Sequence, residues 1–545
     1  MSSATGSAAA STRTENPNDV SPVLIGGEWR EARSVETFQA TDPKTRQTLP
    51  GLYPVSGMTD VEDALAAAEA ASRVLQALPD AAERIATFLE GYAAAIEENA
   101  EALVAAAASE TGLPSTPRLA NVELPRTTGQ LRQAAAAARD GSWRRATIDT
   151  KAGLRSCLAP LGPVFVIGPN NFPFAFNGVA GGDFAAAIAA GNPVIAKAHP
   201  LHPTTSRLLG EAAHTAAQAA GLPAGVVQML YHVEPADGLR LVSDPRLKAV
   251  AFTGSRGAGL RLKSAADAAG KLFFGEMSSI NPVVILPGAL AESGDGIADQ
   301  LATSVMMGCG QFCTKPGLVL LQVGAAGEKF VEVVAAKLAA TPAGTLFSAA
   351  GEASLKSALE TLQGAGAEVV TGGTSEKGGG FGLPNTLLRT TAKRVLGDPQ
   401  TFQTEAFGNA ALIVLADDEP ELLSVLETLE GNLTGTVYSA TDGSDDSAYQ
   451  QVVSVLRPKV GRLLNDKMPT GVAVSPAMNH GGPFPATSQP HFTAVGLPAS
   501  ILRFTQLESY DNVREHRLPP CLRDKNPTGR MWRQVDGDWT RGDIQ

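Results

Sequence analysis

Cysteine is scarce in this sequence, whose 545 residues contain only Cys157, Cys309, Cys313 and Cys521. So few cysteines exclude a disulfide framework and are typical of a reducing compartment, so we expect a cytoplasmic protein. Cys309 and Cys313 stand close together, but no second cysteine pair and no histidine cluster completes a zinc site beside them. The sequence therefore predicts no metal site.

Positive charge is also in short supply. The 44 lysines and arginines are outnumbered by 55 aspartates and glutamates, which gives a net charge of −11. This balance excludes the basic footprint of a protein that binds nucleic acid or an anionic membrane. No apolar run approaches the roughly 20 residues of a membrane-spanning helix. Residues 1–20 lack the apolar core of a secretion signal, so we expect a disordered tail there.

What remains is the composition of an ordinary globular protein, 44% hydrophobic and 18% charged, long enough for two or three domains. The spacing of apolar residues predicts helices over 61–78, 81–109 and 119–139. From Val164 to Phe274, short apolar runs alternate with helical segments, which predicts an α/β fold with a parallel sheet and right-handed crossovers. A second alternating block follows over about 281–477. Residues 469–486 are dense in glycine and proline, so we expect them to be irregular.

Ligands of a parallel sheet bind at the carboxyl ends of its strands, where three distinctive segments fall. One is 169–173. Another is Lys197, which ends a buried strand and can hold ribose hydroxyls or a phosphate; an ordinary solvated lysine is the alternative. The third is a turn that opens a helix, so the amides of Gly254, Ser255 and Gly259 can hold a pyrophosphate there. A simple tight turn is its alternative, because the glycines do not follow G-x-G-x-x-G.

Three further residues suggest thioester chemistry. Cys313 lies in the glycine-flanked segment 310–317, where a turn can expose its sulfur as a nucleophile. Glu276 follows a phenylalanine-rich strand, and partial desolvation there suits a base that works near neutral pH. Asn171 can donate its amide to a developing oxyanion beside the backbone N–H of Cys313, provided that the two loops meet. The alternatives are an inert cysteine, a salt-bridged surface glutamate and a structural asparagine.

Glu405 and Phe407 form another candidate pair in a loop. The carboxylate can bind a second ribose, and the ring can pack on a flat group. A plain loop acid beside a core phenylalanine is the alternative for this pair.

Taken in order, these segments resemble the aldehyde dehydrogenase superfamily. The similarity runs from about Pro22 to Leu522, and its motifs are Asn171-Phe172-Pro173, Lys197, Phe252-Thr253-Gly254-Ser255, Glu276, Gly310-Gln311-Phe312-Cys313 and Glu405-Ala406-Phe407-Gly408. Finer features resemble the subgroup that oxidises α-ketoglutarate semialdehyde (2,5-dioxopentanoate), of which NADP-dependent fatty-aldehyde enzymes are close relatives. Those features lie in 126–132, 180–183, 197–203 and 480–487.

The resemblance implies a role for each of the candidate residues. Cys313 would be the nucleophile, Glu276 the base that activates the deacylating water, and Asn171 the oxyanion donor. The cofactor would be NADP or NAD, with its adenosine and pyrophosphate side held by Lys197, Gly254 and Ser255, and its nicotinamide half positioned by Glu405 and Phe407. The thiolate would attack an aldehyde to give a thiohemiacetal, hydride would pass to NAD(P)⁺, and water would cleave the thioester.

Some positions depart from the family pattern. Members that prefer NAD usually carry a glutamate where this chain has Pro200, so no carboxylate is present to repel a 2′-phosphate and we favour NADP. Thr404 and Asn409 replace the usual glutamate and proline around the Phe-Gly motif. Met277-Ser278-Ser279 replaces the common Leu-Gly-Gly after the base. None of these changes removes a chemical group that the cycle needs.

The family also implies a domain plan. It consists of a Rossmann-like parallel-sheet cofactor domain, an α/β catalytic domain and a small β arm for oligomerisation, which would make a homodimer or homotetramer. On this chain the expected boundaries are 21–141 and 160–279 for the dinucleotide-binding domain, 280–490 for the catalytic domain, 142–159 and 498–520 for the arm, and 521–545 for a C-terminal tail.

The substrate is expected to be a small aldehyde, and a dioxo acid requires a cation for its carboxylate. Arg126, with Gln130 one helical turn later, can line the tunnel; a surface ion pair between Arg126 and Glu123 is the alternative. Phe172, Phe176 and Phe484 would form an apolar wall, which also suits longer aliphatic or aromatic aldehydes.

Two other functional classes compete with a hydrolytic dehydrogenase. In a CoA-acylating relative, a thiol replaces water, and the presence of Glu276 argues against it. A non-catalytic protein on the same scaffold would not need Cys313, Glu276, Asn171 and Lys197 together.

Overall fold

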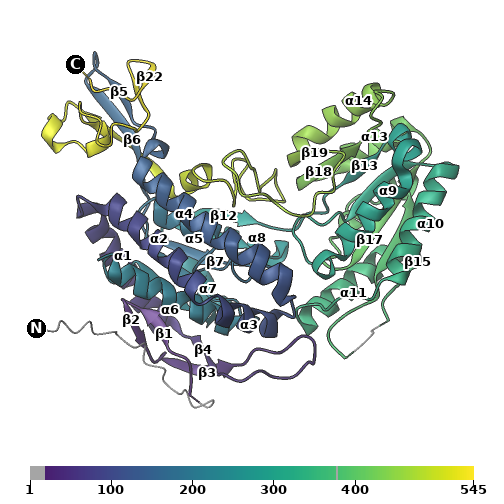
Figure 1. Ribbon diagram of the computed structural model, residues 1–545, viewed down its shortest axis with the longest axis horizontal. Helices are drawn as coiled ribbons and strands as arrows, with labels where there is room; N and C mark the ends of the chain where they lie inside the picture. Colours follow the sequence, from purple (N-terminus) through teal and green to yellow (C-terminus); the bar gives the residue numbers. More distant parts are fainter. Residues whose placement is uncertain (1–18, 376–378, 545) are drawn as a thin grey trace, which may run out of the picture.

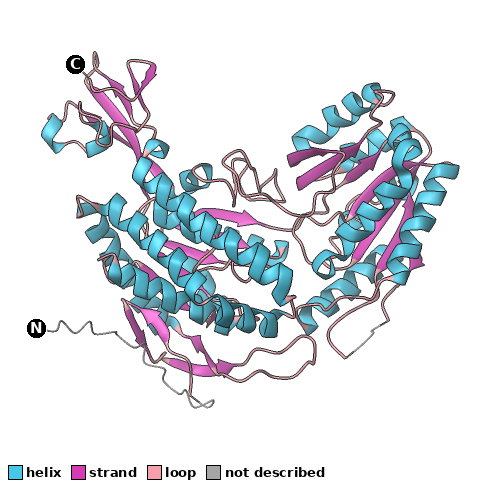
Figure 2. Ribbon diagram, viewed as in Figure 1, coloured by secondary structure: helices cyan, strands magenta, loops and turns pink. Residues whose placement is uncertain are grey.

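The computed structural model describes residues 19–375 and 379–544. Of the expected N-terminal tail over 1–20, residues 1–18 therefore lie outside the described residues. Figure 1 shows two α/β units side by side, with a β arm that projects from the amino-terminal unit and contains the C-terminus. In Figure 2, helices cover both faces of the two large sheets.

The amino-terminal unit is built on a seven-stranded sheet of order β12-β11-β7-β8-β9-β1-β2. Its bounds are β1 Val23–Ile25, β2 Glu28–Arg30, β7 Val164–Ile167, β8 Val194–Lys197, β9 Val227–Leu230, β11 Ala249–Thr253 and β12 Leu272–Glu276. The five strands from β12 to β9 are parallel, and β1 and β2 add an antiparallel edge. These strands are short apolar runs because helices bury them on both faces. The predicted parallel α/β sheet is confirmed.

Strand order places a topological switch point at β7. From β7 the chain moves outward through β8 and β9, and then returns to the other side of β7 with β11 and β12. At such a point the crevice outside the carboxyl ends of the strands is open to a ligand. The loop after β7, Lys197 at the end of β8, and the turn after β11 all lie at this edge.

Eight α-helices belong to this unit as described: α1 Met58–Ala77, α2 Ala81–Glu98, α3 Ala100–Thr111, α4 Leu124–Asp140, α5 Gly182–Ala189, α6 Pro203–Ala219, α7 Pro235–Ser243 and α8 Arg256–Ala268. The helix predicted over 81–109 is broken at Asn99, which separates α2 from α3. The helix predicted from 119 begins as α4 at Leu124, because a π-helix over Ser115–Glu123 precedes it. A small sheet flanks the unit, formed by β3 Ser34–Phe38, β4 Tyr53–Ser56 and β10 His232–Val233.

The second unit has its own seven-stranded sheet, of order β15-β16-β17-β14-β13-β18-β19. Its strands are β13 Val283–Ile285, β14 Leu318–Gln322, β15 Glu368–Thr371, β16 Thr386–Thr391, β17 Ala410–Ala416, β18 Asn432–Tyr438 and β19 Val460–Asn465, and only β15 is antiparallel to its neighbour. Its helices are α9 Pro287–Met306, α10 Ala325–Ala340, α11 Ala349–Gly364, α12 Ala392–Gly397, α13 Glu419–Thr428 and α14 Asp446–Leu456.

The segment from 466 to 498 connects the two units without a helix or an extended strand, as its glycine and proline content predicts. It returns along the end of β12. The N–H of Met277 donates to the carbonyl of Ala486 at 2.7 Å, and the N–H of Ser488 donates to that of Gly275 at 2.8 Å. These bonds fix an irregular segment against the carboxyl end of a sheet strand.

The arm is a five-stranded sheet of order β20-β6-β5-β21-β22, with bounds β5 Thr147–Asp149, β6 Leu154–Pro160, β20 Thr505–Asp511, β21 Arg533–Val535 and β22 Asp538–Thr540. The structure differs here from the expected C-terminal tail over 521–545. Its strands β21 and β22 form a hairpin, and β21 pairs with β5 in parallel. Asp536 and Gly537 both adopt positive φ at the hairpin turn, and Asp-Gly between two short strands is a strong hairpin signal in a sequence.

No helix in 19–375 or 379–544 is long and apolar enough to cross a membrane.

A buried ion pair joins the segment before the arm to the first unit. The guanidinium of Arg503 lies 2.7 Å from Asp183 of α5, and the two side chains are only 1% and 9% exposed. The rings of Phe492 and Phe504 each lie 4.8 Å from the same guanidinium. Removing one partner of such a pair leaves the other charge buried and uncompensated.

We therefore expect Arg503→Met to lower the free energy of unfolding by about 3–5 kcal/mol, since methionine fills the space but leaves Asp183 unpaired. Denaturant unfolding followed by circular dichroism measures this loss. Lys329→Ala is the matched control, because Lys329 and Asp295 form an ion pair that is 63% and 68% exposed, and we expect little change from it. Equal loss in the two variants would contradict the prediction.

Candidate active site

The loop after β7 touches the loop that carries Cys313. Asn171 is buried, and its Nδ2 donates to the carbonyl of Gln311 at 2.9 Å. One amide hydrogen of Asn171 remains for another acceptor. In the described part of the chain the backbone N–H of Cys313 donates to no protein group. The two donors expected to hold an oxyanion thus belong to loops that meet.

The backbone before Cys313 requires glycine at Gly310. Its φ is +68°, and a Cβ there would lie 2.0 Å from the carbonyl oxygen of Gly408. After the nucleophile, Asn281 holds the chain in place, since its Nδ2 donates to the carbonyls of Cys313 and Lys315, both at 2.9 Å. The half-buried Cys313 is therefore presented by a loop that is fixed on both sides.

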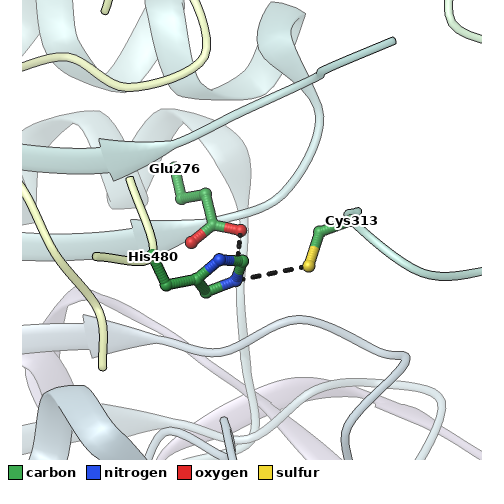
Figure 3. A group of neighbouring side chains, drawn as sticks. All are labelled: Glu276, Cys313 and His480. Carbon is green, nitrogen blue, oxygen red and sulfur yellow. Dashed lines mark hydrogen bonds and ion pairs between the residues drawn. The ribbon is translucent and has the colours of Figure 1, made fainter. Parts of the chain in front are cut away.

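His480 completes a cluster with Cys313 and Glu276 (Figure 3). Its Nε2 lies 3.3 Å from the sulfur of Cys313 and 3.2 Å from Oε1 of Glu276. Glu276 ends β12, Cys313 follows a turn of the second unit, and His480 comes from the irregular segment. In the sequence, His480 stands out only as part of a family motif, and the motif predicts no role for it. It lies 167 residues from Cys313, so no local spacing connects the two.

The charges of this cluster favour a protonated histidine. Burial opposes the charged form of His480, but the neighbouring Glu276 and Cys313 outweigh it and raise the pKa of His480 to about 10. At neutral pH an imidazolium therefore lies between a carboxylate and the sulfur, and a positive group there stabilises a thiolate. Oε2 of Glu276 is buried and has no partner among the described residues, so it can accept a hydrogen bond from a water molecule.

Glu405 lies on the same side as Glu276, close to a buried lysine. The N–H of Ser279 donates to Oε1 of Glu405 at 3.4 Å. Lys315 donates to the carbonyls of Ala406 and Ala410, and burial lowers its pKa to about 8 although Glu405 opposes that shift. Burial also raises the pKa of Glu405. Lys315 was not recognised from the sequence; Phe407 is half-buried beside this pair.

Lys197 lies where the sequence places it, at the end of β8. Among the described residues its Nζ donates only to the carbonyl of Ala198, at 3.4 Å, and burial lowers its pKa to about 8. Burial lowers the pKa values of His199, His202 and His232. The positive charge of Lys197 lowers each of them further. Nδ1 of His232 is buried without a partner in the described ranges.

The glycine-rich turn after β11 leads directly into α8. Ser255 precedes the helix as its N-cap residue, and its side chain makes no capping hydrogen bond. Gly254 and Gly259 are close-packed positions: a Cβ would lie 2.8 Å from the ring of Phe252 at the first and 2.9 Å from the sulfur of Met277 at the second. Close packing alone therefore favours a glycine at position 259, whether or not it contacts a pyrophosphate.

The predicted substrate residues Arg126 and Gln130 lie on α4 beside an aromatic wall. Arg126 donates to the carbonyl of Val472 at 2.8 Å, and its Nη2 is buried with no partner in the described chain. Gln130 is buried and donates to the carbonyl of Ala175 at 3.1 Å. The guanidinium of Arg126 lies 5.2 Å from the ring of Phe176.

Glu123 does not pair with Arg126, so the surface ion pair considered for Arg126 is absent from the described residues. Its carboxylate instead accepts from Arg118 and from the N–H groups of Phe174 and Ala175, at 2.8 and 3.0 Å. Arg118 in turn donates to the carbonyl of Asn171 at 3.1 Å. Glu123 and Arg118 thereby fix the loop that presents Asn171.

The three predicted wall residues do not all come together. Phe172 contacts Phe176 and Phe312 edge-on, with ring centroids 5.3 and 5.4 Å apart, and Phe176 lies 5.7 Å from the ring of His480. Phe484 is 57% exposed and shares in none of these ring contacts. The wall beside the nucleophile is thus Phe172, Phe176 and Phe312.

Dehydrogenases of known function are similar to this chain in sequence. A family model described as the aldehyde dehydrogenase family matches residues 29–473. The chain is 42% identical over 523 residues to alpha-ketoglutaric semialdehyde dehydrogenase 2 of Azospirillum brasilense, covering 93% of this chain and 97% of that one. It is 36% identical to the alpha-ketoglutaric semialdehyde dehydrogenase of Acinetobacter baylyi, with 94% and 96% covered, and 28% identical to a Pseudomonas vanillin dehydrogenase, with 89% and 96% covered.

Solved structures show the same fold. A 1-pyrroline-5-carboxylate dehydrogenase from Thermus with bound NAD superimposes with a TM-score of 0.77, at 24% identity, over 90% of this chain and 92% of that one. Lactaldehyde dehydrogenase from Escherichia coli gives a TM-score of 0.76 at 22% identity, over 90% and 98%.

The imidazolium of His480 makes a testable difference to Cys313. We expect His480→Asn to slow alkylation of Cys313 by iodoacetamide about tenfold or more at pH 7, because the sulfur loses its neighbouring positive charge. Mass spectrometry of the labelled peptide measures this rate independently of turnover. His516→Asn, an exposed histidine of the C-terminal region, is the control. An unchanged alkylation rate in His480→Asn would show that the imidazolium does not activate the sulfur of Cys313.

Proposed function

The chain belongs to the aldehyde dehydrogenase family, and from that premise we propose that it oxidises a carboxylated semialdehyde, such as 2,5-dioxopentanoate, to the corresponding carboxylate. NAD(P)-dependent aldehyde oxidation is the reaction of the family. One observation supports the carboxylated substrate above all others. The guanidinium of Arg126 lies beside the aromatic wall, and its buried Nη2 has no partner among the described residues. It is close enough to the nucleophile for the charges of Cys313 and Glu276 to act on it.

A second cation strengthens this proposal. Arg462 of β19 donates to the carbonyls of Pro469 and Gly471, and neither it nor Arg126 pairs with a carboxylate in the described ranges. Burial lowers the pKa of Arg462, and the charge of Cys313 opposes that shift. Two guanidinium groups from different units therefore hold one loop, 469–472, beside the nucleophile. A substrate carboxylate is the group that such a pair attracts.

The chain's residues provide each part of the reaction. The thiolate of Cys313, stabilised by the His480 imidazolium, attacks the aldehyde carbon, and the new oxyanion accepts from the Cys313 N–H and from Asn171. When bound, NAD(P)⁺ supplies the hydride acceptor. The free Oε2 of Glu276 then takes a proton from water, which attacks the thioester carbon and releases the carboxylic acid and the Cys313 thiolate.

The residues at the carboxyl edge of the first sheet fit a dinucleotide. Lys197 has no carboxylate partner in the described chain, and the N-terminus of α8 offers its amides to a pyrophosphate. The carboxylate of Glu405, on which the charge of Lys315 acts, would accept hydrogen bonds from ribose hydroxyls. We assign the first unit as the cofactor domain and the second as the catalytic domain.

NADP⁺ is the cofactor we favour. Position 200 is a proline and offers no carboxylate. The charge of Lys197 acts on His199, His202 and His232, and a 2′-phosphate can bind beside this lysine. Nδ1 of His232, which has no partner in the described part of the chain, is a further group that such a phosphate can satisfy.

Exposed apolar side chains on the arm favour self-association as a homodimer or homotetramer. Leu507 on the edge strand β20 is 69% exposed, and Trp539 on β22 is 57% exposed. All four cysteines are free, which suits the reducing cytoplasm that we propose as the location.

A dehydrogenase of longer aliphatic or aromatic aldehydes is the second candidate. The wall of Phe172, Phe176 and Phe312 and the similarity to a vanillin dehydrogenase favour it. A CoA-acylating reaction or a non-catalytic role is disfavoured by the intact cluster of Cys313, His480 and Glu276.

Arg126→Met tests the substrate class. We expect kcat/KM for 2,5-dioxopentanoate to fall about 10- to 100-fold, because a charge-assisted hydrogen bond to the carboxylate is lost. We expect kcat/KM for pentanal, which has no carboxylate, to change little. Initial rates of NAD(P)H formation measure both. A wild-type preference for simple alkanals, or equal losses for the two substrates, would contradict the carboxylated substrate but not aldehyde oxidation.

Pro200→Glu tests the cofactor preference. We expect it to weaken NADPH binding at least tenfold and to leave NADH binding nearly unchanged, because a carboxylate beside Lys197 repels the 2′-phosphate. Fluorescence titration with each reduced cofactor measures binding without turnover, and Pro200→Gln is the uncharged control. Tighter wild-type binding of NADH than of NADPH would contradict the preference.

A further inference from the structure

The catalytic cluster is also a set of metal ligands. Zinc is bound by cysteine sulfur, histidine nitrogen and carboxylate oxygen, and one such atom from each of Cys313, His480 and Glu276 lies within 4.8 Å of the other two (Figure 3). Within 19–375 and 379–544 this is the one group of three or more such residues that meets this distance. No sequence pattern predicts this group, because its members are far apart along the chain.

Two of the three observed separations are close to those that a zinc ion imposes. With ordinary bond lengths and tetrahedral angles, sulfur and nitrogen lie about 3.6 Å apart, and nitrogen and oxygen about 3.4 Å apart. In the structure the sulfur of Cys313 is 3.3 Å from Nε2 of His480, and Nε2 is 3.2 Å from Oε1 of Glu276. These two ligand pairs therefore require adjustments of only a few tenths of an ångström. The sulfur and the carboxylate oxygen, which lie within 4.8 Å of each other, must move closer for one ion to reach both.

Charge and exposure also suit a divalent cation. A thiolate and a carboxylate together balance two positive charges, so a buried complex with neutral His480 carries no net charge. His480 and Glu276 are 2% and 1% exposed, whereas Cys313 is half-buried. Oε2 of Glu276 has no partner in the described chain and can become a second contact to the metal. Three protein ligands leave a fourth position for water.

We propose that Cys313, His480 and Glu276 bind one divalent cation of the zinc class, and that this ion and aldehyde oxidation exclude each other. The metal occupies the sulfur lone pair that attacks the aldehyde and the carboxylate that activates water. Zn²⁺, Cd²⁺ and Co²⁺ match a thiolate and an imidazole, whereas Mg²⁺ and Ca²⁺ prefer oxygen ligands. The enzyme is thereby inhibited reversibly by zinc.

Cobalt provides a direct spectroscopic test. Full-length wild-type protein, prepared free of metal and without cofactor, is titrated with Co²⁺ and then with Zn²⁺ against a chromophoric chelator. We expect one equivalent per chain, a sulfur-to-cobalt charge-transfer absorption, and visible bands of four-coordinate Co²⁺ that Zn²⁺ removes. Activity measured in parallel falls as the site fills and returns with the chelator.

Ligand and control variants locate the ion. Cys313→Ser, His480→Asn and Glu276→Gln are each expected to weaken Zn²⁺ binding at least tenfold, and Cys313→Ser to lose the charge-transfer band. Cys309→Ser and His516→Asn are expected to bind as wild type, since Cys309 is a buried cysteine outside the cluster. Circular dichroism confirms that each variant is folded.

Two results would overturn the proposal. One is the absence of a charge-transfer band in the wild type. The other is Zn²⁺ binding to both His480→Asn and Glu276→Gln within twofold of wild type, which would mean that a lone thiol holds the metal. Aldehyde oxidation by the wild type without added metal is a separate measurement, so failure of the metal site is distinguishable from failure of the proposed function.

Discussion

The site depends on how one buried carboxylate is compensated. Glu276 ends a strand of the first sheet and is 1% exposed, a position in which an uncompensated negative charge is costly. Its counter-charge is His480, which comes from an irregular segment held along the same strand by backbone bonds such as that from Met277 to Ala486. The histidine in turn meets the sulfur of Cys313 from the second unit. One electrostatic requirement thus brings three separate stretches of chain to one point.

The arginines near the active site differ in whether they have a carboxylate partner. Arg118 is satisfied inside the protein, by Glu123 and by the carbonyl of Asn171, and so it is a positioning group for the loop after β7. Arg126 and Arg462 donate to carbonyls of one loop, 469–472, and have no carboxylate partner in the described chain. A guanidinium without a counter-ion beside an active sulfur is the arrangement expected for a substrate that carries the missing charge.

The sequence was informative where function follows from local pattern. The first sheet was predictable because its buried strands are short apolar runs, and the ends of β7, β8 and β11 marked one edge of the crevice. Cys313, Glu276 and Asn171 stood out through their loop context. His480 did not, because the irregular segment around it has no periodicity and its partners lie far away in sequence. Lys315 and Arg462 resembled ordinary charged residues, since burial cannot be read from a single position.

The pairing of β5 with β21 affects the order in which the parts of this chain can fold. β5 is synthesised long before its parallel neighbour β21, because the hydrogen bond from Thr150 to Asp536 beside this pair spans 386 positions. At ordinary rates of translation the ribosome needs about 20–80 s to add that many residues. The two large sheets can form during this interval, whereas β5 gains its parallel neighbour only after β21 has been synthesised.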